Sequence, residues 1–362
     1  MKLNGTIFTG WIDWSVDNNN MRSADTFEVA FAISKLPPGF GVDWFASQSA
    51  IQVEVFATED WTGTGPYAPT AADRLILGDV DDIEPIDFEQ NTIHLTGRDF
   101  TAQLIDTKTA ENHQNATSSD VAKLLAGRHG LTAVGPATST RIGQFYSIDH
   151  TDINQQQSEW DLLSKLADFE GFDVFVRGTE LHFEPKTTDT GQRYVVTYTP
   201  RSDDDPVAFA STTTLNFARS LTIAKGVVVE VRSWNAKQKK AFTSSWPKSA
   251  RGTKPGRSVS SDPNGTLVYH FHVPGLTQDQ AIDRAKKLYA QIVQHMVKLH
   301  ADLPGDNLLT CDTIVAVRGT GTSLDQDFFP DSVRRSMSFQ EGYRMSLSAK
   351  NVSADVEAAA TA

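Results

Sequence analysis

One stretch of the chain encodes a complete supersecondary unit: residues 158–183 read SEWDLLSKLADFEGFDVFVRGTELHF. Ser158 precedes the first apolar position and Asp161 follows three residues later, which is typical of a helix N-cap with a capping box. Apolar residues then recur at helical spacing and form a broad stripe that must face a core. They are Trp160, Leu162, Leu163, Leu166, Ala167 and Phe169. Gly171 predicts the end of this helix.

The same stretch continues as a β-hairpin. From Phe172 to Arg177 the side chains alternate between two faces, Gly178 lies in a short turn, and the period of two resumes at Leu181 and Phe183. The whole stretch therefore predicts a helix, a strand, a turn and a second strand.

The N-terminal region, up to about residue 95, has mostly β character. Residues 26–33 and 51–55 alternate between apolar side chains and polar or small ones, which predicts strands with one buried face. Residues 75–80 and 92–95 are two further strand candidates.

Charged residues mark the end of this β region. The acidic run 79–87 is expected to be a solvated turn, because it lacks the spacing of a calcium-binding loop. In the motif Gly97-Arg98-Asp99, Gly97 permits a backbone turn, Arg98 can pair with a nearby carboxylate, and Asp99 can cap a following helix. The motif indicates a structural junction rather than an active site.

The C-terminal region returns to β character and contains two distinctive segments. Residues 235–266 are rich in Lys, Arg, Ser, Gly and Pro, so we expect a long exposed basic loop. This loop is interpreted either as a contact with an acidic neighbouring subunit or as a merely solvated insertion. Thr277 and Gln280 predict a capping box that begins a long helix over residues 278–300.

Three segments carry a resemblance to a known family. Residues 158–183 resemble the corresponding segment of the baseplate hub proteins of contractile phage tails, the late control gene D group. Residues 95–106, LTGRDFTAQLID, are similar to the Gly-Arg-Asp plus Leu-x-Asp signature of that group. The order of helix, Pro-Gly-x-x-Leu segment and closing strands from Thr277 to Lys350 is a third similarity. Together these segments cover most of the chain in the expected order.

The resemblance implies an α+β fold that is mainly β, with two antiparallel β-barrel domains similar to the tail-tube fold. The first barrel is expected over residues 1–98 and the second over residues 207–352. A mixed α/β insert of one or two small lobes lies between them, over residues 99–206, and residues 353–362 form a flexible tail.

The resemblance also implies a function and a set of partners. In that family three chains assemble, and three times two barrels give a pseudo-sixfold ring that lines the DNA channel. The homotrimer adapts the sixfold tail tube to the threefold central spike. The expected partners are the tail tube protein, the central spike protein, other baseplate and tape-measure proteins, and passing DNA that is not bound specifically. The expected location is the tail baseplate of the virion, after synthesis and assembly in the host cytoplasm.

Composition agrees with these expectations. The 362 residues are 39% hydrophobic and 22% charged, which indicates a globular protein of several domains. No secretory signal or membrane span is predicted. A single cysteine excludes an intramolecular disulfide. The net charge of −12 argues against a dedicated nucleic-acid binder and is compatible with a channel wall that repels DNA.

Candidates for chemistry are few. Cys311 lies after the last histidine of the chain, so the Cys-then-His order of many cysteine peptidases cannot be met, and we interpret it as a small residue at a strand edge. His270 and His272 occupy one face of an alternating strand at metal-ligand spacing. With the His150-Thr151-Asp152 motif they could form a zinc site, but a half-exposed polar strand is the favoured interpretation.

The sequence therefore predicts a non-enzymatic structural protein, with no catalytic, cofactor-binding or metal-binding residues and no cofactor. Two alternatives remain open. One is a cell-wall hydrolase at the tail tip, dependent on zinc or on paired carboxylates. The other is the hub of a long non-contractile tail or of a related injection machine.

Overall fold

The computed structural model describes residues 1–20, 23–58, 68–109, 111, 113, 115–139, 157–185, 193–201, 207–221, 226–235, 240–247, 267–273, 275–293 and 296–351. Three predictions fall outside these residues: the His150-Thr151-Asp152 motif, most of the basic loop 235–266, and the tail 353–362.

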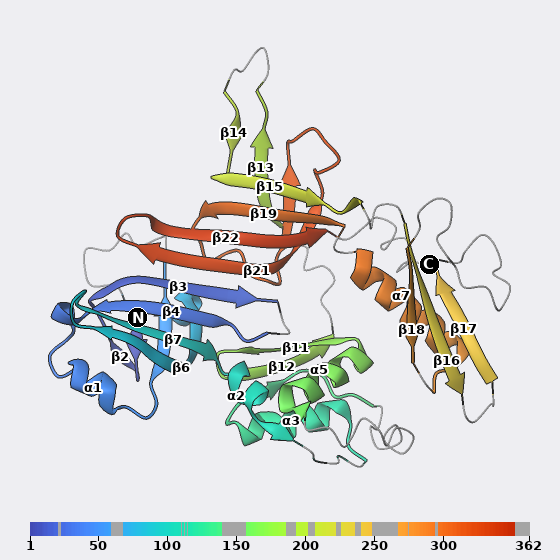
Figure 1. Ribbon diagram of the computed structural model, residues 1–362, viewed down its shortest axis with the longest axis horizontal. Helices are drawn as coiled ribbons and strands as arrows, with labels where there is room; N and C mark the ends of the chain where they lie inside the picture. Colours follow the sequence, from blue (N-terminus) through green and yellow to red (C-terminus); the bar gives the residue numbers. More distant parts are fainter. Residues whose placement is uncertain are drawn as a thin grey trace. The chain divides into compact units, whose positions relative to one another are not determined.

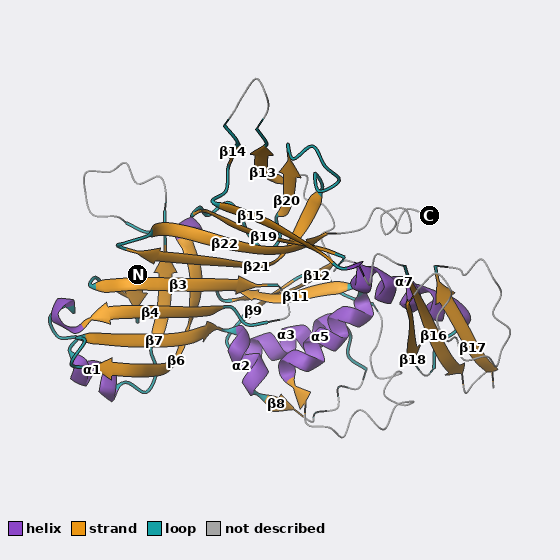
Figure 2. Cartoon of the chain, turned by 45° about the horizontal axis from the view of Figure 1, so that its top comes forward, coloured by secondary structure: helices purple, strands orange, loops and turns teal. Residues whose placement is uncertain are grey.

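The chain is an α+β protein in which β-strands predominate, so the predicted fold class is confirmed (Figure 2). Contacts within the chain group it into two compact units. Unit 1 comprises Met1–Tyr194, Asp302–Thr313 and Pro330–Leu347; unit 2 comprises Val195–Ala301, Ile314–Phe329 and Ser348–Ala362. The predicted domains, residues 1–98, 99–206 and 207–352, follow the order of the chain instead and stay a prediction.

An antiparallel sheet forms the larger part of unit 1 (Figure 1). Its strands are β1 (Lys2–Leu3), β2 (Thr6–Ile7), β3 (Trp11–Asn19), β4 (Thr26–Ala32), β5 (Gln52–Phe56), β6 (Arg74–Asp87), β7 (Thr92–Asp99) and the end of β21 (Asp327–Ser338). They are hydrogen-bonded in the order β21-β3-β4-β7-β6-β5-β1-β2. Helix α1 (Val42–Ser47) and two short 3-10 helices, Ile33–Lys35 and Ala71–Asp73, lie in the connections. The alternation predicted for residues 26–33 and 51–55 is confirmed, since Phe27, Val29, Phe31, Val53 and Val55 are all buried.

The rest of unit 1 is built around the stretch that the sequence singled out. Its elements are α2 (Thr101–Asp106), β8 (Lys108–Thr109), α3 (Ser118–Arg128), β9 (Thr132–Val134), β10 (Gln157–Ser158), α5 (Glu159–Glu170), β11 (Phe172–Arg177) and β12 (Glu180–Pro185). Ser158 and Asp161 form the predicted capping box, with both hydrogen bonds at 3.0 Å, and Gly171 ends α5 with a φ of 76°. Helix, strand, turn and strand are therefore confirmed. The apolar stripe of α5 packs with α3, β11 and β12 in one core, except for Phe169, which was predicted to face the core and is 44% exposed.

Unit 2 contains β13 (Arg193–Thr199), β14 (Phe209–Ala210), β15 (Thr214–Arg219), β16 (Val227–Asn235), β17 (Lys240–Trp246), β18 (Leu267–His272), α7 (Gln278–Val293), β19 (Val297–Pro304), β20 (Ile314–Arg318) and the end of β22 (Gly342–Asn351). Strands β16, β17 and β18 form a separate three-stranded sheet. None of the helices in the described part of the chain is both long and apolar enough to cross a membrane.

Two predictions for the C-terminal region are wrong. The long helix does not reach residue 300: α7 ends at Val293, and Val297–Pro304 form strand β19. Along β19 buried and exposed residues alternate, and this period of two prevails over the helical spacing that Leu299 also fits. Within the expected basic loop, Lys240–Trp246 form strand β17, because pairing with β16 satisfies the backbone of this segment.

Two predictions for the junction after the first β region also need correction. The acidic run 79–87 is not a turn but the second half of strand β6, and the turn lies at residues 88–91. Ile83 and Ile86 pack against the core of the sheet, which keeps this acidic segment in the strand. Gly97 does not form a turn either, because it lies inside β7.

Glycine is required at position 97 by close packing rather than by backbone conformation. A Cβ atom there would lie 2.2 Å from the carbonyl oxygen of Asp79 on β6 and 2.4 Å from the ring of Phe27 on β4. Gly78 on β6 packs equally closely against β7, since a Cβ at Gly78 would lie 2.1 Å from the carbonyl oxygen of Arg98. At these two positions the paired strands β6 and β7 therefore approach one another at a distance that only glycine allows.

Replacing Gly97 by alanine is expected to destabilise unit 1, because the new methyl group would overlap the Asp79 carbonyl and the Phe27 ring. Overpacking of this kind costs about 1–3 kcal/mol of unfolding free energy, which urea denaturation measures. Gly127→Ala in α3 is the matched control, since an added Cβ there meets nothing within 4 Å. That variant is expected to be as stable as the wild type or up to ~1 kcal/mol more stable. Equal stability of the two variants would contradict the packing argument.

Candidate functional site

The predicted histidine pair lies on strand β18, and the described residues around it do not supply the further ligands that a metal site needs. His270 Nδ1 is 2.9 Å from Glu230 Oε2 on β16, and both His270 and His272 are exposed. Among the residues that the structure describes, no group of three or more His, Cys, Asp or Glu side chains is placed to hold a metal ion. The pair is therefore part of a solvent-facing polar strand.

Cys311 lies in a turn, so its predicted place at a strand edge is wrong. Its Sγ donates a hydrogen bond to the carbonyl oxygen of Asn18, 3.2 Å away, and the side chain is half-buried. Burial raises the pKa of the Cys311 thiol to about 12. The thiol consequently stays protonated at neutral pH, whereas a nucleophilic cysteine needs a thiolate.

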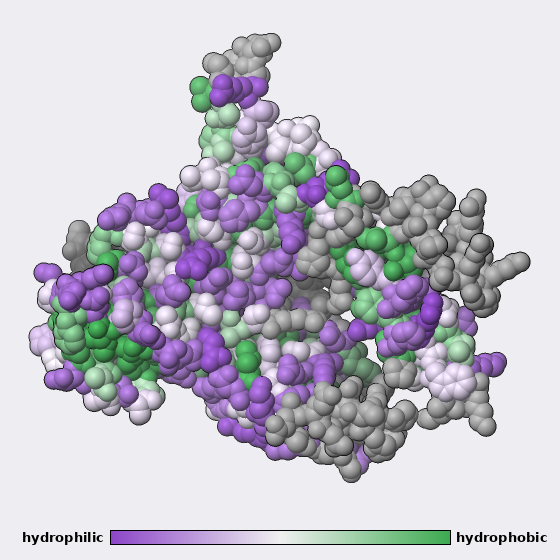
Figure 3. Space-filling view, in the orientation of Figure 1, coloured by the Kyte–Doolittle hydropathy of each residue, from purple (hydrophilic) through white to green (hydrophobic). Residues whose placement is uncertain are grey.

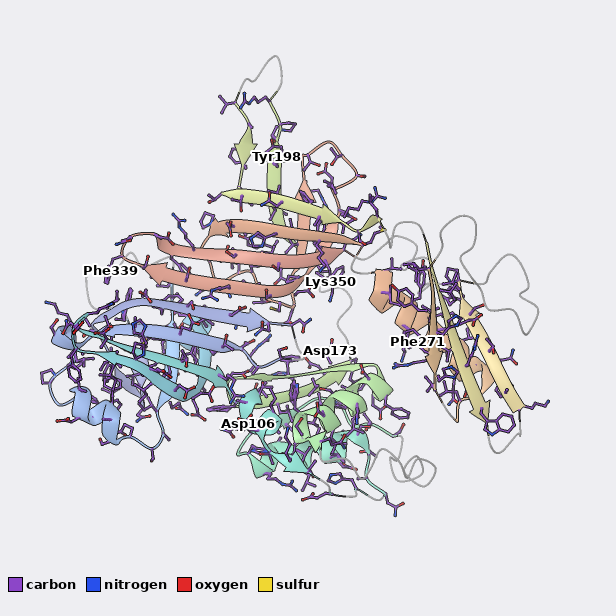
Figure 4. All side chains as sticks on the ribbon, in the orientation of Figure 1. Asp106, Asp173, Tyr198, Phe271, Phe339 and Lys350 are labelled. Atoms are coloured by element: carbon purple, nitrogen blue, oxygen red, sulfur yellow. The ribbon has the colours of Figure 1, made fainter. Side chains whose placement is uncertain are left out.

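The motif Arg98-Asp99 joins the sheet of unit 1 to helix α2. Arg98 Nε lies 2.7 Å from Asp81 Oδ2, and its Nη2 lies 2.8 Å from Asp106 Oδ2 at the end of α2 (Figure 4). Asp99 accepts hydrogen bonds from the backbone N–H and the hydroxyl of Thr101, at 3.1 and 3.0 Å. The predicted carboxylate partner of Arg98 is confirmed, whereas the N-cap of α2 is Phe100 and not Asp99, whose side chain instead binds the first residue of the helix.

Unit 1 contains a polar cavity of about 600 Å³ next to this junction, partly open to solvent. Residues from β3, β6, β11 and the 307–312 loop line it, and the charged groups on its wall are Asp25, Arg74, Asp99, Arg177, Glu180, Asp312 and Arg335. No histidine is among its described lining residues. Cys311, which also lines the cavity, therefore has no histidine beside it among the described residues.

Two carboxyl groups in this cavity have perturbed pKa values. Asp25 accepts hydrogen bonds from Asn18 Nδ2 and from the backbone N–H of Asn19, both at 2.8 Å, yet loss of solvent raises its pKa to about 6. Asp99 is only 8% exposed, and burial together with the charge of Asp25 raises its pKa to about 8. Both carboxyls therefore change charge near neutral pH.

Arg335 holds the wall of the cavity together. Its side chain is buried and donates to the carbonyl oxygens of Asp306 (2.9 Å) and Leu309, and to Asn18 Oδ1 (3.0 Å). Asp306 in turn accepts the hydroxyl of Tyr194 at 2.6 Å. These bonds attach the segment after β19 to β3 and β13, which gives the polar residues of the cavity a structural role.

Apolar residues gather at one surface of unit 1, over α1 and β2 (Figure 3). Beneath this surface the ring of the buried Phe8 lies 4.7 Å from that of Phe40 and 5.9 Å from that of Trp44, whereas neighbouring Ile7 is 57% exposed. At the turn between β21 and β22, Phe339 is 76% exposed and stacks on Trp11 at 5.0 Å (Figure 4). Surfaces of this composition are typical of protein–protein contacts rather than of catalytic sites.

Solved structures match this architecture over nearly the whole chain. A tail protein from Neisseria meningitidis MC58 superimposes with a TM-score of 0.67 and 14% identity, over 96% of this chain and 94% of that one. The 43 kDa tail protein of prophage MuSo2 from Shewanella oneidensis matches with a TM-score of 0.61 and 15% identity, over 96% of both chains. The chain has a phage tail-protein fold.

The tail-protein fold extends to secretion machinery. The c3393 protein of E. coli is a component of the type VI secretion system that resembles the T4 phage tail proteins gp27 and gp5. It matches with a TM-score of 0.53 and 12% identity, over 98% of this chain and 77% of that one. No family model and no curated protein matches the sequence. The predicted resemblance to phage tail proteins is thus confirmed at the level of the fold.

Sequence reasoning missed the cavity of this tail-protein fold. Asp25 has no motif around it, and its partners Asn18 and Asp99 come from β3 and from the end of β7. The only one of these residues that the sequence analysis singled out was Asp99 in the Gly-Arg-Asp motif, and it was interpreted only as a helix cap.

Stability is expected to fall as the pH rises from about 4 to about 8, because burial raises the pKa of Asp99 to about 8 and that of Asp25 to about 6. A raised carboxyl pKa favours the folded state at low pH, and this contribution is lost as the pH passes the folded-state value. The melting temperature across this range tests the expectation.

Asp99→Asn is expected to flatten this pH profile, since the amide keeps an acceptor for Thr101 and cannot ionise. Asp120→Asn is the control: Asp120 is an exposed capping residue whose pKa is lowered by its bonds to Thr117. An Asp99→Asn profile as steep as that of the wild type would contradict the assignment.

Proposed function

We propose that the chain is the structural hub of a phage tail baseplate. It acts as a homotrimer in which each chain supplies two tube-like β-barrels, so that a ring of pseudo-sixfold symmetry meets the tail tube on one side and the threefold spike on the other. The observation that carries this proposal is the match to two tail proteins over more than nine-tenths of both chains.

The described surface and interior support a binding role. Phe339, exposed at the β21–β22 turn, and Ile7, exposed on β2, offer apolar contact area for neighbouring subunits. Cys311 in the cavity of unit 1 has a raised pKa and no histidine beside it among the described residues, which favours a non-enzymatic protein. No observation favours the zinc-dependent or carboxylate-dependent hydrolase, so that alternative is not proposed.

The net negative charge supports a position along the DNA channel in which the protein does not bind the DNA specifically. Unit 1 carries 34 Asp and Glu against 16 Lys and Arg, a net charge of −18. An acidic wall repels the phosphate backbone and lets a duplex pass. The proposed partners are the tail tube protein, the spike, and other baseplate and tape-measure proteins. The proposed location is the virion tail, after assembly in the host cytoplasm.

Light scattering of the purified chain tests the proposal. The expected mass is about three times that of the 39.7 kDa chain, reached as the protein concentration rises. Adding the tail tube protein of the same phage is expected to give a larger complex that cosediments, and an unrelated tube protein serves as the control. A chain that stays monomeric at every concentration and salt, and also fails to bind tube protein, would overturn the proposal.

A further inference from the structure

The three-stranded sheet of unit 2 has two open edges. Strand β16 lies in its middle, antiparallel to β17 and parallel to β18, and in the described part of the chain neither outer strand pairs with any other. Helix α7 packs against one face of this sheet (Figure 1). The three strands and α7, named here the lobe, enclose a core of Val227, Val229, Val231, Ala281, Ala285, Leu288, Tyr289 and Val293. The lobe is therefore held together by its own core, while both of its edge strands have unused backbone groups.

The hydrogen bonds of β18 show which backbone groups face outward. The N–H groups of Leu267 and Val273 donate to the carbonyl oxygens of Gly226 and Arg232, so odd-numbered residues of β18 face β16 and even-numbered ones face the free edge. Even-numbered residues of β16 are used in this way, which leaves its odd-numbered residues to bond β17. These lie opposite even-numbered residues of β17. The residues with outward N–H and C=O groups are consequently Val268, His270 and His272 on β18, and Ala241, Thr243 and Ser245 on β17.

Neither edge of the lobe has the features by which proteins keep other strands away. Those features are charged side chains, prolines and bulges. Strand β18 reads LVYHFH and β17 reads KAFTSSW, with no proline, acid or register shift and with Lys240 as the only Lys or Arg. The second half of β6 provides a contrast, since in the described structure it pairs only with β7 but contains Pro85, two register shifts and the exposed acids Asp82 and Glu84. The chain thus protects that open edge and leaves the two edges of the lobe able to pair.

A second copy of the chain fits both edges at once. Strand β17 has seven residues and β18 has six, and each presents three outward-facing residues. Within one copy these two strands run in opposite directions, and rotation about an axis along the strands preserves this, so β17 of the next copy would meet β18 in the antiparallel sense. Charge favours the same contact. Copies of unit 1, at a net charge of −18, repel one another, whereas the two edge strands carry no acid.

We propose that β18 of one copy pairs with the free edge of β17 in the next copy, so that the sheets of neighbouring lobes become continuous. The proposal rests on the trimeric hub proposed above and adds which strands form its repeated contact. Main-chain hydrogen bonds stabilise this contact, as in other complexes formed by strand addition. The contact is head-to-tail, and three lobes of three strands each close a ring of nine strands in which neither edge stays open.

Proline variants test the contact with little change to the lobe itself. Variant A is His270→Pro and variant B is Thr243→Pro, and each removes an N–H group that faces outward while the bonds to β16 remain. Both side chains are exposed, and proline is tolerated on an edge strand where its nitrogen faces away from the sheet, so both variants are expected to fold. Circular dichroism checks this. In light scattering, each variant alone is expected to stay monomeric at concentrations where the wild type is a trimer.

Mixing the two variants tests the head-to-tail arrangement. Variant A retains an intact β17 edge and variant B an intact β18 edge, so the mixture is expected to form a one-to-one complex without closing a ring. The matched controls are His270→Ala and Thr243→Ala, which remove the same side chains and keep the backbone N–H groups. Both are expected to remain trimeric.

A disulfide tests the same contact without proline, should either proline variant fail to fold. The chain carries His270→Cys together with Thr243→Cys. Within one copy β16 separates these positions by two strand spacings, about 10 Å, which a disulfide cannot bridge. Between copies they lie on the paired edges, so oxidation is expected to give covalent dimers and trimers on a non-reducing gel. Each single replacement is expected to give monomers only.

The possible outcomes separate the two proposals. Folded proline variants that stay trimeric, or a double-cysteine chain that forms a trimer without crosslinking, overturn the pairing of β17 with β18 and leave the hub proposal standing. Folded, monomeric variants that form no mixed complex also overturn it, because a head-to-tail contact requires complementation. If the wild type never self-associates, the pairing fails, and binding of tail tube protein then decides the hub proposal. Loss of tube binding in variant A with the trimer intact would replace the second copy by the tube protein as the occupant of the β18 edge.

Discussion

The close approach of the paired strands β6 and β7 is the constraint on which unit 1 depends. Gly78 and Gly97 let each strand approach the carbonyl oxygen of the other at a distance that excludes any side chain. Because β7 lies so close, Arg98 reaches Asp81 on β6 and Asp106 on α2 at the same time. The chain then passes into the helical part with Asp99 turned into the polar cavity. One backbone contact thus fixes the sheet, the junction and the cavity together.

Local signals in the sequence predicted local structure well. Ser158, Asp161 and Gly171 act within a few residues of their own position, so the ends of α5 could be read directly from the sequence. The alternation of apolar and polar residues in β4 and β5 could also be recognised in the sequence, because one face of each strand is buried. The tail-protein fold was predicted from the resemblance to a known family. The arrangement of the strands in such a fold depends on contacts between distant residues, so local patterns alone could not have predicted it.

Long-range contacts explain what the sequence could not provide. The acidic run of β6 looks like a turn until Arg98 and the sheet core are in place beside it. Leu299 fits a helical period as well as a strand period, and only tertiary pairing decides between them. Gly97 has an ordinary backbone conformation, so its requirement is visible only when Asp79 and Phe27 are packed against it. The raised pKa of Asp99 likewise depends on burial and on a carboxyl from a distant strand.

The chain contains one thiol, and the structure gives that thiol an unexpected use. Cys311 donates to Asn18 and lies in the loop that Arg335 anchors, and its high pKa keeps it unreactive in the folded structure. Alkylating reagents attack only a thiolate that solvent can reach. The rate at which Cys311 is modified therefore reports how often this wall of unit 1 opens, before and after assembly, without any engineered label.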